Sequence, residues 1–254
     1  MAVIAYVENG LAGCRLAVER DTVTIVVDAL RASANIVSMF HYGTREVLVV
    51  EQVEQAFAER QRRPGALLVG ERGGPMVHGF DLGNSPLQEP PSMDISSVVF
   101  SSSNCSRCCV GAASCPVTLL GSTVNASAVA ALALAEARRL GKEELVFITA
   151  GAAVDEVRLT IEDHLAVGAI VARCGDVVPG NDRARVCRAL TRDIGRETLT
   201  ECFRDCDNGS RLTRIGLGED VRFAACLDVF EAVPRVVGTV DLPDGGLGAL
   251  LRGG

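Results

Sequence analysis

Short runs rich in Val, Ile and Leu alternate with segments of helical periodicity over the first two thirds of the chain, and this alternation restricts the fold more than any other feature. A strand, a helix and a second strand in succession favour a parallel βαβ unit, because parallel neighbours need a long crossover connection. The sequence therefore predicts an α/β fold, a layered sandwich in which a mainly parallel sheet is flanked by helices. The predicted strands are 22–27, 45–50, 66–70, 96–100, 116–121 and 144–150, and the predicted helices are 33–42, 53–62, 125–140 and 161–174.

The composition changes after Gly175, where Arg- and Asp-rich segments replace the alternating pattern. We therefore predict an α/β domain over residues 1–175 that carries the functional site, and a smaller C-terminal α/β part over 176–254 packed on it. A single intertwined domain is the alternative. The elements expected in the C-terminal part are helices at 183–194 and 197–205, a strand at 233–240 and a frayed Gly-rich tail at 242–254.

Charge and hydropathy exclude two classes of partner. The net charge is -7, no basic run is present and only 4% of residues are aromatic, so we expect no nucleic-acid binding. No window approaches the roughly 18 apolar residues that span a bilayer, and the N-terminus lacks the basic region of a signal peptide. We expect a cytoplasmic protein, and the Ala-rich segment 126–135 and the strand edges favour a homo-oligomer.

Polar side chains follow four of the predicted strands at the point where each strand ends. Because ligands of open α/β sheets bind outside the carboxyl ends of the strands, these residues are the first candidates for a site. Carboxylates there would bind a hard cation, and arginines and helix N-termini beside them would bind phosphate or carboxylate. The residues are Asp28, Arg31 and Ser33, then Glu71 and Arg72, then Ser101 to Asn104, and finally Ser122, Thr123 and Asn125.

The Gly-rich loop, residues 70–86, is too polar for a strand or a helix and too long for a simple connection, which favours a binding loop. Its glycines allow turns that bring backbone N–H groups close to a ligand. The alternative is a surface loop in which Arg72 and Asp81 merely pair. The polar side chains that it offers are Glu71, Arg72, Asp81, Asn84 and Ser85.

Several of these strings together resemble the 2-phosphosulfolactate phosphatase family. The similarity is collinear from about residue 21 to residue 237, and GERGG followed by GFDLGNSP is its most specific part. It implies an α/β layered fold and a Mg²⁺-dependent hydrolase that converts 2-phosphosulfolactate to 3-sulfolactate and phosphate on a route to coenzyme M. The strings are VVDALRAS (26–33), GERGG with GFDLGNSP (70–86), SSSNCS (101–106), GSTVNASAVA (121–130), ITAG with IEDHLAVGAI (148–170) and CLDVFEAVP (226–234).

The resemblance assigns roles to the polar residues, because a substrate with phosphate, sulfonate and carboxylate groups needs arginines and Mg²⁺ at close range. Arg31 and Arg72 become the anion clamps. Glu162 has an alternative role in compensating the dipole of its helix. The catalytic candidates are Asp28, Glu71 and Asp81; the substrate-binding candidates are Arg31, Ser33, Arg72, Asn84, Ser85, Asn104, Ser106 and Asn125; the metal-ligand candidates are Asp28, Glu71, Asp81, Glu162 and Asp163.

The sequence departs from the family pattern at Cys105, where the family has glycine in a Thr-Thr-Thr-Asn-Gly-Thr stretch. This change would put a thiol where the backbone approaches a ligand or adopts positive φ, and it bears on the choice of substrate. Two alternatives follow: a non-catalytic protein that binds organophosphates or sulfonates, and a phosphatase for a different small 2-phospho-acid. The spacing of Cys105 and Cys108 also allows a zinc or redox site, although buried thiols explain it better.

Overall fold

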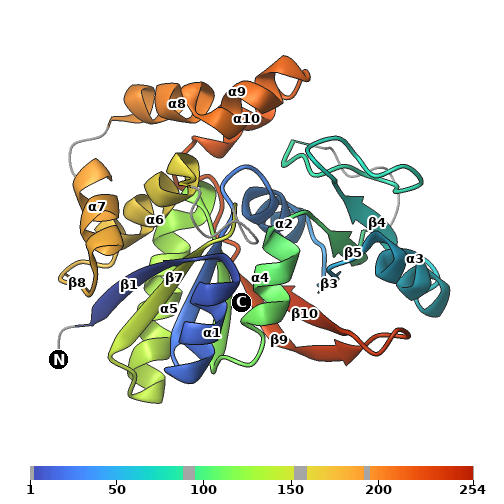
Figure 1. Cartoon of the computed structure of the whole chain (residues 1–254), viewed down its shortest axis with the longest axis horizontal. Helices are drawn as coiled ribbons and strands as arrows, with labels where there is room; N and C mark the ends of the chain where they lie inside the picture. Colours follow the sequence, from blue (N-terminus) through green and yellow to red (C-terminus); the bar gives the residue numbers. More distant parts are fainter. Residues whose placement is uncertain (1–2, 88–94, 152–158, 192–194, 254) are drawn as a thin grey trace.

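The computed structural model describes residues 3–87, 95–151, 159–191 and 195–253, with the side chain of Arg196 excepted. The described residues form one mixed sheet flanked by helices, which confirms the predicted α/β class (Figure 1). The strands in sheet order are β4 (Leu67–Gly70), β5 (Ser97–Ser101), β3 (Glu46–Val49), β10 (Leu247–Gly253), β9 (Pro234–Asp241), β6 (Val117–Gly121), β2 (Val23–Val27), β7 (Glu144–Thr149), β1 (Ile4–Asn9) and β8 (Val178–Pro179).

The sheet contains two parallel groups joined by an antiparallel hairpin. Strands β6, β2, β7, β1 and β8 are parallel, as are β4, β5 and β3. Between them lie β9 and β10, which pair antiparallel with each other and with β6 and β3. Only Leu119 and Arg235 pair between β6 and β9, so the two groups need not be coplanar. Because β9 and β10 connect the two parallel groups in this way, residues that follow strands of both groups line the same cavity.

Helices cover both faces of the sheet, which explains why the predicted strands are mostly apolar runs and do not alternate between apolar and polar residues. In β2, Val23, Ile25 and Val27 pack with α5 and α6, whereas Val26 points to the other face and packs with α1, α2 and α4. The helices are α1 (Gly10–Glu19), α2 (Ala32–His41), α3 (Val53–Arg62), α4 (Cys105–Gly111), α5 (Ala126–Leu140), α6 (Ile161–Arg173), α7 (Asp182–Thr191), α8 (Arg196–Asp205), α9 (Asp207–Arg214) and α10 (Gly218–Ala224), with a 3₁₀ turn at Thr123–Asn125.

Each strand and helix predicted before Gly175 overlaps one of β2 to β7 or one of α2, α3, α5 and α6. Helices α7 and α8 and strand β9 also lie where they were expected, although residues 192–194 are outside the described part. The prediction of a frayed tail is wrong, because residues 247–253 form β10 and pair with β3 and β9. The sequence did not predict β1, α1, α4, α9 or α10.

The predicted boundary near residue 175 stays a prediction, but β8, β9 and β10 from the C-terminal part all belong to the one sheet. In Figure 1, α8, α9 and α10 lie together beyond α6 and α2, at the carboxyl ends of the central strands. No helix in the described ranges is long and apolar enough to cross a membrane.

Candidate active site

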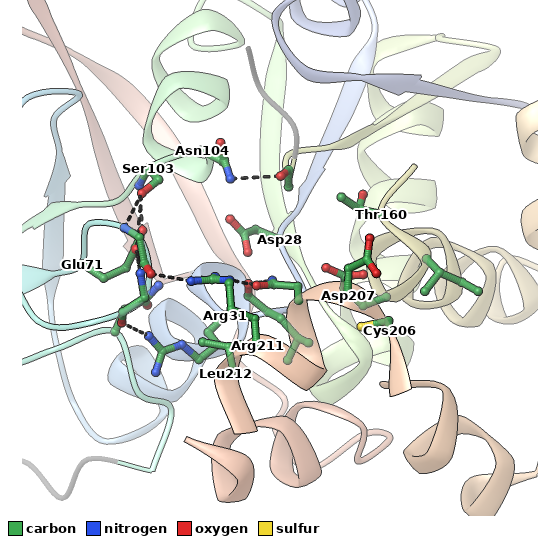
Figure 2. Close-up of a pocket in the computed structure, with 18 of the residues that line it drawn as sticks. Asp28, Arg31, Glu71, Ser103, Asn104, Thr160, Cys206, Asp207, Arg211 and Leu212 are labelled. Carbon is green, nitrogen blue, oxygen red and sulfur yellow. Dashed lines mark hydrogen bonds between the residues drawn. The ribbon is translucent and has the colours of Figure 1, made fainter. Parts of the chain in front are cut away.

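One cavity of about 500 Å³ opens where the carboxyl ends of β2, β4, β5 and β7 meet the C-terminal helices (Figure 2). Some lining residues directly follow these strands, and the others come from the start of α6 and from α8 and α9. Helix N-termini at this end of the sheet present unpaired N–H groups that favour anions. The lining residues are Asp28, Leu30, Arg31, Glu71, Gly73, Gly74, Asn84, Ser103, Asn104, Gly151, Leu159, Thr160, Ile161, Glu162, Asp205, Cys206, Asp207, Asn208, Arg211 and Leu212.

Asp28 directly follows β2 and is only 5% exposed. One carboxylate oxygen, Oδ1, accepts the backbone N–H of Ala32 at 3.3 Å, and the N–H of Asp28 itself donates to Oγ of Ser33 at 2.9 Å. No donor among the described residues contacts Oδ2, and Figure 2 shows the side chain in the middle of the cavity. The loop therefore holds Asp28 with one carboxylate oxygen available to a ligand.

The carboxyl groups of the cavity affect one another electrostatically. Burial raises the pKa of Asp28 to about 7, and the negative charges of Glu71 and Glu162 contribute to the increase. Burial, followed by the charges of Glu162 and Asp28, raises the pKa of Asp163 well above its ordinary value. Carboxyl groups behave in this way when they share a poorly solvated space. A bound cation would relieve the repulsion.

Glu162 and Asp163 are neighbours in the first turn of α6 but have different surroundings. Glu162 lines the cavity beside Cys206, where burial and then the Glu162 charge raise the pKa of the thiol to about 12. Asp163 is 1% exposed, and its two oxygens accept the N–H groups of Ala29 and Gly151, each at 2.8 Å. Asp163 therefore ties the loop after β2 to the loop after β7, while Glu162 is open to a ligand.

Glu71 follows β4 and fastens the Gly-rich loop to the end of β5. Its Oε1 accepts the N–H of Ser103 and its Oε2 accepts the N–H of Gly74, each at 2.7 Å. The backbones approach closely here, because a Cβ at Gly70 would lie 1.9 Å from the carbonyl oxygen of Ser101. Only glycine fits that position. The loop thus reaches the cavity through Glu71, Gly73, Gly74 and Asn84.

Arg31 lies between the loop after β2 and the C-terminal helices and is 3% exposed. Its guanidinium donates to Oδ2 of Asp220 on α10 and to the carbonyl oxygen of Gly74, each at 2.5 Å. Asp220 is also buried, and its Oδ1 accepts the hydroxyl of Ser85 at 2.6 Å. The predicted clamp Arg31 therefore lines the cavity, but its charge is already paired with a buried carboxylate.

Asn84 and Asn104, both predicted to bind substrate, line the cavity from two different loops. Nδ2 of Asn35 donates to Oδ1 of Asn84 at 3.1 Å. Nδ2 of Asn104 donates to the carbonyl oxygen of Gly151 at 3.0 Å, a contact drawn in Figure 2. These contacts orient the two amides and leave Nδ2 of Asn84 and Oδ1 of Asn104 for a ligand.

Seven predicted residues do not line the cavity: Ser33, Arg72, Asp81, Ser85, Ser106, Asn125 and Asp163. Oδ2 of Asp81 accepts the N–H of Leu68 at 2.7 Å and forms an ion pair with Arg60. Arg72 donates to the carbonyl oxygens of Glu71 and Glu51, each at 2.7 Å. These contacts shape the Gly-rich loop from outside the cavity, so Asp81 and Arg72 are not placed to meet a ligand there.

Ser106 and Asn125 bind the backbone at the starts of helical segments. Oγ of Ser106 accepts the N–H of Ser102 at 2.9 Å. Oδ1 of Asn125 accepts the N–H of Ser122 at 2.9 Å, and its Nδ2 donates to the carbonyl oxygen of Ala232 at 2.9 Å. Ser and Asn cap backbones with the same donors and acceptors that bind ligands, so the sequence pattern is the same for both roles.

The expectation for Cys105 is wrong. Cys105 begins α4 and needs no positive φ. Its side chain is fully buried in the core, with its Sγ 3.8 Å from that of Cys109, and it does not line the cavity. A glycine is not needed at this position, because the Cys105 thiol is buried in the core and does not reach the cavity. All ten cysteines are free thiols and eight of them are buried, including Cys105 and Cys108, which agrees with the interpretation of this pattern as buried thiols.

Helices α8 and α9 supply cavity residues that the sequence did not predict. Arg211 donates to the carbonyl oxygen of Gly73 and, at 2.6 Å, to Oδ1 of Asn208. Nδ2 of Asn208 donates to the carbonyl oxygen of Leu30 at 2.9 Å. The only available signal was the spacing of three between Asn208 and Arg211, which places both on one helix face. The unpredicted residues from these helices are Asp205, Cys206, Asp207, Asn208, Arg211 and Leu212.

The fit of a metal ion depends on the oxygen atoms that face the cavity. In the described ranges, no group of three or more His, Cys, Asp or Glu side chains could hold a metal alone. Magnesium commonly uses one or two carboxylates and completes its shell with water and substrate phosphate. Asp28 and Glu162 fit that requirement, whereas Glu71 and Asp163 direct their oxygens to backbone N–H groups.

Comparison with known proteins points to one family. Residues 14–239 match the family model described as 2-phosphosulpholactate phosphatase. A protein of Deinococcus radiodurans named probable 2-phosphosulfolactate phosphatase is 36% identical over 230 residues, which cover 89% of this chain and 92% of that protein. A protein of Carboxydothermus hydrogenoformans with the same name is 33% identical over 218 residues, covering 85% of this chain and 86% of that protein.

Proposed function

The chain belongs to the 2-phosphosulfolactate phosphatase family, and from this premise we propose that it hydrolyses 2-phosphosulfolactate to 3-sulfolactate and phosphate with the help of Mg²⁺. A water oxygen bonds to phosphorus, the bond between phosphorus and the oxygen on C2 breaks, and that oxygen takes a proton. The product lies on the route to coenzyme M that the family resemblance implies.

The observation that carries the proposal is a cavity of the described residues in which carboxylates, arginines and helix N-termini converge. Asp28 and Glu162 line it, and Arg31 and Arg211 line it from the loop after β2 and from α9. Helices α2, α6 and α9 all begin at or next to lining residues. Phosphoryl transfer depends mainly on positioning the substrate and on neutralising its anionic oxygens, and these groups together supply both.

Asp28 and Glu162 are the residues that would hold Mg²⁺, since each presents a carboxylate to the cavity. When bound, the ion would supply Lewis-acid stabilisation of the charge on the phosphoryl oxygens. It would also reduce the repulsion between carboxyl groups, which adds to the effect of burial in raising the pKa of Asp28 to about 7.

The remaining residues orient the cavity. Asp163 fixes the loop that carries Asp28, and Glu71 fixes the glycines that follow it. Arg31 is held by Asp220 and presents its remaining N–H groups from a buried position. The N–H groups in the first turn of α6 would donate to phosphate oxygens.

The direct test measures phosphate release from racemic 2-phosphosulfolactate with Mg²⁺ and, separately, with EDTA. We expect turnover only with Mg²⁺. Asp28→Asn and Glu162→Gln should each lose most of the activity, because each removes a charged cavity oxygen. Asp81→Asn should retain most of it, since that carboxylate lies outside the cavity.

Other outcomes would assign a different function. Binding of 2-phosphosulfolactate without phosphate release would identify a non-catalytic binding protein. A higher kcat/KM for another small 2-phospho-acid would identify a phosphatase of different specificity. Inactivity of folded, Mg²⁺-loaded protein on every such ester would contradict the proposal.

We also propose that the protein acts in the cytoplasm as a homo-oligomer. Ten free thiols fit a reducing compartment. The exposed side chains of Tyr42 and Val229, next to Phe230, offer an apolar contact surface. Light scattering coupled to size-exclusion chromatography measures the assembly, and a monomer at all concentrations would contradict this part.

A further inference from the structure

Two guanidinium groups meet the Gly-rich loop at adjacent peptide units. Arg31 donates to the carbonyl oxygen of Gly74, and Arg211 donates to that of Gly73. Both arginines line the cavity, and Figure 2 shows them reaching the same loop from two different elements. Like charges that approach each other in this way are stabilised when an anion lies near them.

The two arginines differ in how their charges are balanced. Arg31 forms a buried ion pair with Asp220 at 2.5 Å. Arg211 contacts only neutral acceptors, the carbonyl oxygen of Gly73 and Oδ1 of Asn208, and no carboxylate of the described residues pairs with it. Arg211 is therefore a cavity cation whose charge is left for a ligand.

The cavity thus presents two chemically different kinds of charged group. The carboxylates of Asp28 and Glu162 attract anionic groups only through a cation, and phosphate and carboxylate oxygens are the ligands that Mg²⁺ prefers. A sulfonate is a weak metal ligand but accepts charge-assisted hydrogen bonds from a guanidinium. Of the three anionic groups of the proposed substrate, the sulfonate is therefore the one suited to Arg211.

We propose that Arg211 is the specificity-determining residue that binds the sulfonate of the substrate. This inference rests on the proposed function, but it concerns a residue of α9 that neither the sequence motifs nor the family resemblance assigned. It also gives the C-terminal helices a role in substrate binding, because α9 then binds the sulfonate, the group that distinguishes 2-phosphosulfolactate from simpler 2-phospho-acids. Asn208, bonded to Arg211 and to Leu30, keeps α9 in register with the loop after β2.

The test combines a side-chain change with a substrate change. Arg211→Gln is compared with wild type on 2-phosphosulfolactate and on 2-phospholactate, which lacks only the sulfonate. We expect kcat/KM for 2-phosphosulfolactate to fall by about 50-fold, the usual effect of losing a hydrogen bond to a charged group. The value for 2-phospholactate should change by no more than about twofold, because the lost partner is absent from that substrate.

Arg214→Gln is the matched control, since Arg214 lies on the same helix and its Nε donates only to the carbonyl oxygen of Ser210. It should leave both substrates unaffected. Arg211→Lys keeps the charge without the planar fork and should show a smaller loss confined to 2-phosphosulfolactate. Equal losses on both substrates in Arg211→Gln would overturn the proposal, as would no loss on either. Activity of wild type on neither substrate would instead refute the proposed function.

A binding measurement gives a second readout that needs no turnover. Calorimetry with 3-sulfolactate and with lactate, both without metal, compares the sulfonate and its absence directly. Wild type should bind 3-sulfolactate more tightly than lactate, and Arg211→Gln should lose that preference while thermal melting shows it folded. An unchanged preference in the variant would overturn the proposal.

Discussion

At the scale of single residues, Asp28 has the environment that most directly connects structure to chemistry. A buried carboxylate is usually neutralised by a partner or protonated. Asp28 has an N–H donor on only one oxygen, and Glu71 and Glu162 add negative charge around it. Its pKa of about 7 means that the chain folds around a group whose ionisation is unfavourable without a cation.

The stability of the protein should therefore depend on pH through Asp28. Between about pH 4 and pH 7 the unfolded chain loses this proton and the folded chain keeps it, so the folded state is progressively destabilised as the pH rises. Asp28→Asn removes the penalty and should be more stable than wild type above pH 7 by roughly 2–4 kcal/mol in EDTA, with little difference near pH 4. Urea unfolding at several pH values measures this.

Two controls separate the ionisation of Asp28 from other effects. Asp182→Asn replaces a carboxylate that is 99% exposed and should leave the pH profile unchanged. Mg²⁺ should stabilise wild type above pH 7 and leave Asp28→Asn almost unaffected, because the ion needs the charged carboxylate. Parallel profiles for Asp28→Asn and wild type would show that Asp28 does not keep its proton in the folded state between about pH 4 and pH 7.

The same scale shows which site residues a sequence can identify. Asp28 and Glu162 were predictable because each follows an apolar strand or opens a periodic helix, and such positions reach the ligand end of the sheet. Asp81 and Arg72 have equally suggestive sequence contexts, yet they bond to Arg60, Leu68 and the backbone outside the cavity. Arg211 belongs to a helix with many charged residues, so only the folded contact with Gly73 distinguishes it.

At the scale of elements, burial on both faces made most of the sheet predictable. All five residues of β2 and of β6 are buried, so each is a mostly apolar run in the sequence, interrupted only by Thr24 in β2 and Thr118 in β6. Strand β10 differs because it mixes exposed and buried residues and contains two glycines, Gly248 and Gly253, and because its pairing with β3 and β9 depends on the tertiary structure. A Gly-rich tail and a pairing strand therefore have similar sequences, and only the presence of edges to pair with decides between them.

The structural role of β10 can be measured with two leucines of the same strand. Leu251 is fully buried beside β3 and β9, whereas Leu247 is 45% exposed. Leu251→Ala should lower the free energy of unfolding by about 2–5 kcal/mol because it leaves a cavity in the core, and Leu247→Ala should change it by about 0.5 kcal/mol or less. Similar small effects at both positions would restore the original expectation of a frayed tail.

At the scale of the whole molecule, the excess of acidic residues includes the cavity carboxylates that would hold a cation. The net charge of -7 opposes the approach of an anionic ester, and the cavity itself has more carboxylates than arginines. A cation held by Asp28 and Glu162 would make the local charge around these carboxylates positive. Arg211 provides a second positive charge in the cavity. The long-range field therefore remains repulsive while the short-range contacts are attractive.

This separation predicts an unusual response to salt. Like-charged partners associate faster when ions screen their repulsion, and the screening length falls from about 30 Å at 0.01 M to about 8 Å at 0.15 M. With Mg²⁺ saturating, we expect kcat/KM for 2-phosphosulfolactate to rise roughly two- to fivefold between these ionic strengths, whereas kcat should stay nearly constant because bound substrate is screened little. Sucrose at matched osmolality should have no such effect. A steady decrease with salt would mean that Arg31, Arg211 and the bound cation govern the encounter and that the acidic surface does not.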